Sequence, residues 1–214
     1  MKIPLANKLK KRLHREIGLL QDEVLDIAYE IENSVILHGG TAIWRCYGGN
    51  RFSEDLDFYS KPRKFENEFE ALVKRRGLFI TKIKKTDNLV FSKISNGEVE
   101  VRAEFNFSKS VRGTLGTYER MDSSLTTIFT LSPEELIFEK IDAYSNRMLI
   151  RDIYDLVHLT AMVENPKSVA ERMKSFLINV KKPVDEKNIK AIIYSGAVPS
   201  FEQMLEILKK RFSH

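Results

Sequence analysis

The chain has 214 residues, 43% of them hydrophobic and 30% charged, which suffices for one large domain or two small ones with a packed core. Its formal net charge of +5 permits a polyanionic partner without requiring one. The single cysteine, Cys46, excludes an intrachain disulfide framework and a cysteine-rich zinc site. The sequence contains no run of about 18 apolar residues, so no membrane span is predicted. The first residues lack the apolar core of a signal peptide, and we therefore expect a cytoplasmic protein.

The first predicted element is a long amphipathic helix over Asn7 to Glu32. Apolar residues recur there at helical spacing, and they are Leu9, Leu13, Ile17, Leu20, Val24, Ile27 and Ile31. The first turns are basic, with Lys8, Lys10, Lys11, Arg12 and Arg15. Such charges are more often a solvated helix face, although they can also meet nucleic acid.

The stretch Val35 to Tyr59 is predicted to fold as a strand, a glycine turn, a short helix and a second strand. The apolar run at Val35 to Leu37 suits a buried strand, and Gly39-Gly40 follows where that strand gives way to a helix. We expect this helix over Thr41 to Tyr47, where glycines that tolerate positive φ end it. The chain becomes extended again over Ser53 to Tyr59.

Two aspartates on the second strand carry the chemistry of this stretch. Asp55 and Asp57 are two residues apart, so both carboxylates point to one face of a strand, where they repel each other. A divalent cation offsets that repulsion, and Mg²⁺ prefers such hard oxygen ligands. The bare N–H groups of the Gly39-Gly40 turn and the positive end of the helix favour a phosphate. Together these features predict a metal-dependent nucleotidyltransferase.

The remainder of the first half is predicted to contain one helix and four strands. The helix covers Phe65 to Arg76, and the strand candidates are Leu78 to Lys84, Leu89 to Ile94, Glu98 to Phe107 and Leu125 to Leu131. Asn96-Gly97 is a strong hairpin signal between two of them. We expect a loop over Ser108 to Ser124, in which the basic part from Lys109 to Arg120 mildly favours RNA.

A third carboxylate is expected from the strand over Glu98 to Phe107. A two-metal site usually takes a further carboxylate from a neighbouring strand. Glu100 and Glu104 both lie on the polar face of this alternating strand, so either suits the role. The ordinary alternative is a half-exposed strand whose charges lie in water, with Arg102 paired to a glutamate.

From Ser132 onward nearly everything is predicted to be helical. The signature Ser132-Pro133-Glu134-Glu135 combines an N-cap serine, a proline at the first position and a capping box. The expected helices are Ser132 to Arg147, Ile150 to Val163, Ser168 to Val180, Asp185 to Tyr194 and Ser200 to Phe212. We therefore predict an α/β domain over residues 1–131, including the long first helix, and a helical domain over residues 132–214.

For several polar residues near these elements the sequence allows both a functional and a structural role. Lys140 shares a stripe with apolar neighbours, where a lysine more often extends outward along its stem than faces a cleft. Asp152 has an ordinary explanation at the start of a helix, next to the helix dipole, whereas Asp155 lies a turn further in and requires a partner. Ser53 either hydrogen-bonds a phosphate or the water of a metal, or caps its strand. For His38, beside the glycine turn, a core or hydrogen-bonded role is the ordinary explanation.

The segment HGGTAIWRCYGGNRFSEDLDFY resembles the first motif of the AbiEii/AbiGii toxin family of nucleotidyltransferases. The later segments SPEELIFEKIDAYSNR and RDIYDLVHL look like the Glu-Lys-x-x-Ala and Arg-Asp-x-Tyr-Asp-Leu motifs of that family, in the expected order. The match covers residues from about 35 to 160. It implies an α+β fold, in which a mixed sheet of the DNA-polymerase-β-like nucleotidyltransferase kind is flanked by helices and followed by a C-terminal helical bundle.

The resemblance also implies roles for particular residues. Asp55 and Asp57 become Mg²⁺ ligands, with Glu104 preferred over Glu100 as the third carboxylate, and the site then holds one or two ions. The residues that line the triphosphate become Gly39, Gly40 and Ser53. Lys140 becomes a contact to the nucleotide phosphates or a group that stabilises charge during transfer, and Asp152 or Asp155 completes the site.

The expected function is transfer of a nucleoside monophosphate from an NTP to an acceptor hydroxyl. The resemblance implies an RNA acceptor, with tRNA 3′ ends as the substrate in some members of the family, and the role of a toxin with a cognate antitoxin. Two alternatives remain open. One is transfer to a small molecule or to a protein side chain, and the other is a binding protein that keeps the fold without turnover.

Overall fold

The structure is a computed structural model that describes residues 3–61, 65–108 and 110–212, with the backbone alone given at residues 65–67. In these residues seven strands form one mixed sheet, in the order β3-β4-β5-β2-β1-β7-β6. They are β1 (Ile36–His38), β2 (Asp55–Tyr59), β3 (Phe79–Thr86), β4 (Leu89–Ser95), β5 (Glu100–Asn106), β6 (Thr114–Glu119) and β7 (Leu125–Thr130). β2 runs parallel to β5 and antiparallel to β1, which confirms the predicted mixed sheet.

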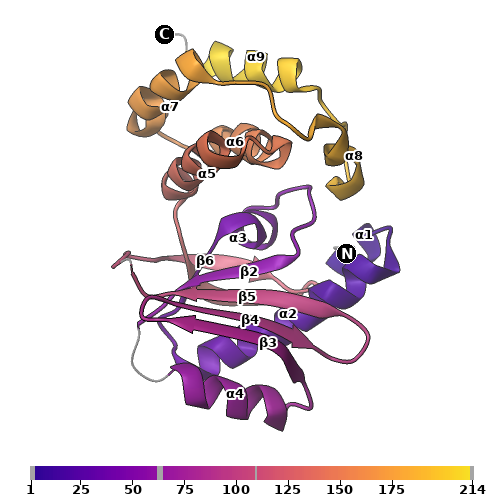
Figure 1. Ribbon diagram of the computed structural model, residues 1–214. Coiled ribbons are helices and arrows are strands. Elements are labelled where there is room, and N and C mark those ends of the chain that lie inside the picture. Colours follow the sequence, from indigo (N-terminus) through magenta and orange to yellow (C-terminus); the bar gives the residue numbers. More distant parts are fainter. Residues whose placement is uncertain (1–2, 62–64, 109, 213–214) are drawn as a thin grey trace.

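Helices surround the sheet and form a separate layer at the C-terminal end (Figure 1). Those of the first half are α1 (Leu5–Lys8), α2 (Arg12–Ile31), α3 (Gly39–Cys46) and α4 (Phe65–Arg75). The later ones are α5 (Pro133–Arg147), α6 (Ile150–Met162), α7 (Lys167–Asn179), the 3₁₀ turn η1 (Glu186–Asn188), α8 (Ile189–Ile192) and α9 (Phe201–Phe212). The predicted helical bundle is therefore confirmed, while the domain boundary near Leu131 stays a prediction. No helix in the described part of the chain is long and apolar enough to cross a membrane.

The two faces of β4 and β5 differ as the sequence alternation predicts. Val90, Ile94, Val101 and Phe105 are buried on the face that packs on the helices, and α2 and α4 contact each other beneath it. Arg102 and Glu104 alternate with these residues and lie on the opposite face. That opposite face carries the polar groups of the site described below.

The first helix is shorter than predicted. The chain breaks between Lys8 and Arg12, where Leu9 is extended and fully buried and its carbonyl accepts a 2.8 Å hydrogen bond from Arg15 Nε. Leu13, in the first turn of α2, is 56% exposed although the periodicity placed it on the apolar stripe. The prediction of one helix over Asn7 to Glu32 was therefore wrong at its start. Lys11 donates to the Ala191 carbonyl and Arg12 pairs with Glu16, so these basic residues already have protein partners.

Two further expectations need correction. The segment predicted as a loop over Ser108 to Ser124 contains β6, which pairs with β7 from Thr114↔Thr130 to Glu119↔Leu125. Thr114, Thr117 and Tyr118 suit a strand, but the Gly and Ser residues in and around this segment favoured a loop. The helix expected over Asp185 to Tyr194 is only η1 and the single turn of α8. The sequence Lys61-Pro62-Arg63-Lys64 predicts a turn, and residues 62–64 of it lie outside the described residues. Lys109 of the basic loop also lies outside them.

Candidate active site

A pocket of about 280 Å³ lies where the β1–α3 turn and the strands β2 and β5 face helices α5 and α6. The sequence-predicted residues that line it are Gly39, Gly40, Ser53, Asp55, Asp57, Glu104 and Lys140. Asp152 and Asp155 do not line it; they lie behind it, nearly inaccessible to solvent, where they contact the cations of its wall. The structure thus brings together residues that are up to about a hundred positions apart in the chain.

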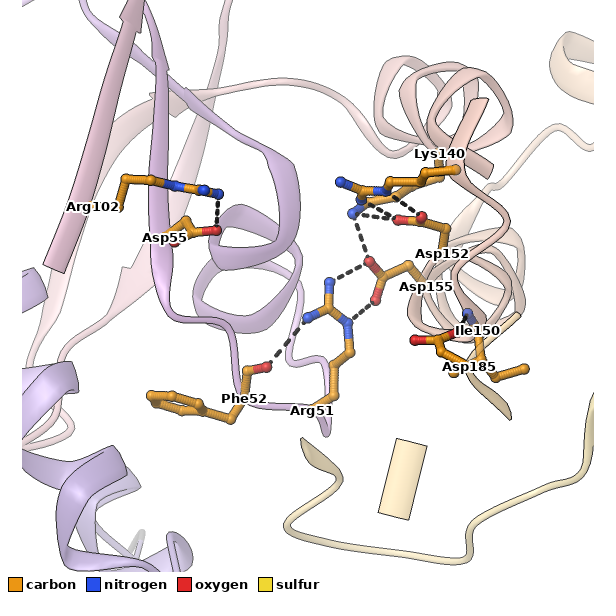
Figure 2. Close-up of polar contacts among 10 residues, drawn as sticks. Arg51, Phe52, Asp55, Arg102, Lys140, Ile150, Asp152, Asp155 and Asp185 are labelled. Atoms are coloured by element: carbon orange, nitrogen blue, oxygen red, sulfur yellow. Dashed lines mark hydrogen bonds and ion pairs between the residues drawn. The ribbon is translucent and has the colours of Figure 1, made fainter. Parts of the chain in front are cut away.

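Sheet register places three carboxylates on one side of this pocket. In the parallel pairing of β2 with β5, Asp57 is opposite Glu104, and Asp55 is opposite Arg102, whose guanidinium donates to the Asp55 carboxylate (Figure 2). Adjacent strands are about 4.8 Å apart, so Asp57 and Glu104 are close neighbours. Glu100 lies outside this pocket, where its carboxylate accepts a 2.5 Å hydrogen bond from Lys93 Nζ.

Burial and mutual repulsion act on these carboxylates together. Burial raises the pKa of Asp55, an effect opposed by Arg102 and reinforced by the charge of Asp57. Burial likewise raises the pKa of Glu104, and the charge of Asp57 raises it further. A cation near these oxygens would relieve the repulsion that disfavours their ionised forms.

The donor set fits Mg²⁺. In the described residues no three His, Cys, Asp or Glu side chains form a ready metal cage. Mg²⁺ commonly binds through one or two carboxylates together with substrate phosphates and water, and does not require an all-protein cage. The oxygens of Asp55 and Asp57, with Glu104 beside them, match that mode of binding.

The glycine turn fits closely against the carboxylates and leaves room for a ligand. Gly39 has φ +72°, and a Cβ there would lie 2.4 Å from Asp57 Oδ2. A Cβ at Gly40 would lie 2.6 Å from both Arg51 Nη2 and Ser53 Oγ. These residues form the first turn of α3, whose leading N–H groups have no partner within the helix. Backbone donors at a helix N-terminus, uncovered by side chains, suit a phosphate.

A buried ion network holds two cations in the pocket wall (Figure 2). Asp155 accepts hydrogen bonds from Arg51 Nε at 2.6 Å and from Arg51 Nη2 at 2.5 Å, and its Oδ2 lies 2.8 Å from Lys140 Nζ. The capping box of Ser132 and Glu135 begins α5 and so fixes the position of Lys140 two turns later. Lys140 is 5% exposed and faces this cleft, so the outward extension that its spacing favoured is wrong.

Further arginines line the pocket from α5 and α6. Arg147 donates to both oxygens of Asp152, at 2.8 Å from Nε and 2.7 Å from Nη2. Arg151 Nε is buried and has no hydrogen-bond partner among the described residues. An orphaned buried donor beside a glycine turn is what an anionic ligand would satisfy.

Sequence reasoning missed the pocket positions of Arg51, Arg102, Arg147 and Arg151. For Arg102 it considered a glutamate partner, whereas the structure pairs this residue with Asp55. The signal for Arg51 and Arg151 was present, because each begins a motif segment, RFSEDLDF and RDIYDL. Nothing in local spacing indicates that Arg147 meets Asp152. His38 is confirmed as a hydrogen-bonded residue, since its Nδ1 lies 3.1 Å from Glu139 Oε2.

Replacing Asp155 with asparagine should destabilise the protein by about 3–5 kcal/mol, because it leaves Arg51 buried without its counter-charge and leaves Lys140 with Asp152 alone, 3.4 Å away. Burial acts to raise the pKa of Asp155, but Arg51 and Lys140 outweigh it and lower the pKa from 3.8 to about 2. A carboxyl with a depressed pKa stabilises the folded state above pH 4 and loses this effect as the pH falls towards 2. Urea unfolding from pH 7 down to pH 2 measures the difference between wild type and Asp155→Asn, which should shrink on acidification.

Asp142→Asn provides the matched control for that experiment. Asp142 pairs with Arg172 at 2.5 Å on the surface, and the Asp142 side chain is 62% exposed. Exposed pairs contribute at most about 1 kcal/mol, so this variant should unfold nearly as wild type does. Equal destabilisation by the two variants would contradict the structural role given to Asp155.

Comparison with known proteins agrees with this site. The family model described as "Nucleotidyl transferase AbiEii toxin, Type IV TA system" matches residues 25–195. That range contains the glycine turn, the carboxylates of β2 and β5, and the cations of α5 and α6. The chain belongs to the AbiEii family. It is therefore a nucleotidyltransferase of a toxin family, and enzymes of this kind use an NTP and a divalent metal.

Individual proteins are similar to this AbiEii protein along almost its whole length. An uncharacterized protein of Aquifex aeolicus is 26% identical over 212 residues, covering 92% of this chain and 96% of its own. The crystal structure of JHP933 from Helicobacter pylori has a TM-score of 0.69 at 20% identity, covering 95% of this chain and 91% of its own. MenT4, a nucleotidyltransferase toxin of Mycobacterium tuberculosis H37Rv, has a TM-score of 0.60 at 16% identity, covering 94% and 82%. These structural likenesses confirm the nucleotidyltransferase fold.

Proposed function

We propose that this AbiEii protein uses Mg²⁺ to transfer a nucleoside monophosphate from an NTP to the 3′-hydroxyl of an RNA, with tRNA as the acceptor. We further propose that it acts as the toxin of a pair with a cognate antitoxin. The observation that carries the proposal is the position of Asp55, Asp57 and Glu104 beside the bare glycine turn, in a pocket walled by lysine and arginine.

Each group in the pocket has a role in this reaction. The N–H groups of Gly39 and Gly40, with Ser53, bind the phosphates of the NTP, and Lys140 and Arg151 neutralise their charge. Asp55 and Asp57 hold the ion, with Glu104 as the third carboxylate. Asp152 and Asp155 act as positioning residues, because they contact Arg147, Lys140 and Arg51 from behind.

The transfer itself requires orientation and charge stabilisation. The acceptor oxygen forms a bond to the α-phosphorus in line, while the bond from that phosphorus to the bridging oxygen breaks and pyrophosphate leaves. When bound, Mg²⁺ neutralises charge that develops on the leaving pyrophosphate. The cations of the wall hold the β- and γ-phosphates against the glycine turn, so the chain supplies positions and forms no covalent intermediate.

The acceptor class is tested by a screen that crosses each of the four NTPs, labelled at the α-phosphate, with several acceptors. The acceptors are tRNA, tRNA whose 3′ end has been oxidised with periodate, a protein partner and small hydroxylated molecules. The proposal expects label in intact tRNA only, for at least one NTP. Label in a small molecule or protein would favour the rival acceptors, and Mg²⁺-dependent NTP binding without product would favour a binding protein without turnover.

Glu104→Gln should reduce the rate of transfer by about tenfold or more, since it removes one negative charge from the metal-binding face. Glu100→Gln makes the same chemical change four residues away, outside the pocket, and should alter the rate by less than about twofold. Steady-state rates of label incorporation at saturating NTP measure both. Equal effects of the two substitutions would argue against Glu104 as the third carboxylate.

A further inference from the structure

The sheet continues beyond the pocket as a surface that the proposed site does not use. Among the described helices, none lies in front of the polar side of β3, β4 and β5, and α2 passes behind these strands (Figure 1). We call this side, beyond Arg102 and Glu104 of the pocket, the open face; register places on it Phe79, Lys82, Lys84, Thr86, Leu89, Phe91, Lys93, Ser95 and Glu100. Its basic and aromatic side chains lie on β3 and β4, and Lys93 pairs with the carboxylate of Glu100.

The open face is continuous with the carboxylates. One row of register partners runs from Asp57 through Glu104 and Phe91 to Lys84. A second runs from Asp55 through Arg102 and Lys93 to Lys82. At about 4.8 Å per strand, Phe91 lies roughly 10 Å from Asp57, and β3 lies roughly 14 Å from it. The open face therefore begins where the proposed chemistry takes place.

Protection of the sheet edge explains only part of this surface. Lysines on an edge strand such as β3 commonly prevent edge-to-edge pairing, which would account for Lys82 and Lys84. It does not account for Phe79, which is 60% exposed, or for Phe91, whose ring carries the Arg102 guanidinium 5.9 Å from its centroid. Aromatic rings interleaved with cations on an exposed sheet suit stacked bases and a phosphate backbone.

We propose that the open face binds the single-stranded 3′ segment of the RNA acceptor and directs its terminal hydroxyl to the carboxylates. Phe91 and Phe79 stack on bases, and Lys82 and Lys84 contact backbone phosphates. This proposal rests on the proposed function for the identity of the acceptor, but the binding it describes needs no turnover.

The first test measures binding of a fluorescent single-stranded oligoribonucleotide with a free 3′ end, by anisotropy without NTP. Phe91→Ala should raise the Kd about tenfold, in line with the loss of one stacked base, and Phe91→Tyr should restore it. Lys82→Ala/Lys84→Ala should lower the slope of log K against log salt by roughly 1.4, since each phosphate contact on a single strand contributes about 0.7. Thermal melts establish that the variants fold.

Lys74→Ala/Lys85→Ala is the matched control, because it removes the same charge from the other side of the sheet. Lys74 lies on α4, and Lys85 is opposite the buried Val90 and pairs with Glu70. Its Kd and its salt slope should stay close to wild type. If both lysine pairs shift binding equally, the RNA responds to net charge alone and the proposal is overturned.

Kinetics separate this proposal from the proposed function. In tRNA labelling, Phe91→Ala should raise the KM for tRNA about tenfold while the KM for NTP and kcat stay within about twofold. A rise confined to the KM for NTP would mean that the open face holds the incoming nucleotide, which overturns the proposal. RNA binding that depends on the open face, without any transfer, would support this inference and contradict the proposed function. Transfer to tRNA together with unaltered RNA binding by the open-face variants would support the proposed function and contradict this inference.

Discussion

Asp57→Ala should abolish nucleotidyl transfer, with a loss of roughly 10³-fold or more, and leave the fold intact. Metal-bound charge stabilisation contributes several kcal/mol to such reactions, and each 1.4 kcal/mol is a factor of ten in rate. Asp57 lies opposite Glu104 and next to Asp55 on the same face of the sheet, so its removal also relieves like-charge repulsion. The melting temperature should therefore be unchanged or higher. Label incorporation into tRNA and a thermal melt measure the two effects.

The control for this substitution is Asp142→Ala, which removes an aspartate from the exposed side of α5. It should transfer label at nearly the wild-type rate. RNA labelling by Asp57→Ala at the wild-type rate would remove the basis for placing the metal on β2. A melting temperature that falls by many degrees would instead mean that Asp57 serves the fold.

Gly39→Ala should reduce transfer by about a hundredfold, because the added methyl group would displace a metal-binding carboxylate or the phosphate-binding turn. A Cβ at Gly39 would lie 2.4 Å from Asp57 Oδ2, so the short Asp57 side chain or the turn must move. Displacements of about 1 Å at a catalytic site can cost about 10²-fold in rate. The φ of +72° adds a backbone strain of about 1–2 kcal/mol. Rates of tRNA labelling and thermal stability are the measurements.

Gly48→Ala separates strain from collision. Gly48 has φ +66°, close to that of Gly39, but a Cβ there meets nothing within 4 Å in the described structure. Both alanine variants should lose similar stability, and only Gly39→Ala should lose most of its activity. Similar activities would show that the turn tolerates a side chain and that its close approach to Asp57 has no catalytic importance.

Local patterns predicted the centre of the site because its parts are close in the chain. The two-residue spacing of Asp55 and Asp57 fixes their common face, and Gly39-Gly40 marks the strand-to-helix turn whatever surrounds it. Spacing could not choose between Glu100 and Glu104, because they share a face and differ only in their position along it. The parallel pairing of β2 with β5 brings Glu104 opposite Asp57. The register between two strands that are distant in the chain cannot be predicted from the sequence of either strand alone.

Contacts between distant segments account for what sequence reasoning missed. Arg51 begins a motif segment, but nothing in that segment names its partner, and only the packing of α6 brings Asp155 to it. Its spacing alone predicted that Lys140 extends outward from an apolar stripe, whereas in the structure it is buried beside the Asp155 carboxylate. The break before α2 follows from burial of Leu9, a tertiary contact that overrides a continuous helical pattern. The roles of all these residues in catalysis remain predictions.

The most direct test of the central claim compares two labels on the same NTP, incubated with tRNA, Mg²⁺ and the wild-type protein. Nucleotidyl transfer at the pocket of Asp55 and Asp57 predicts that label from the α-phosphate enters the tRNA, that label from the γ-phosphate leaves as pyrophosphate, and that chelation of the metal stops both. Label from the γ-phosphate on the tRNA, or incorporation that persists in the chelator or in Asp57→Ala, would contradict the account.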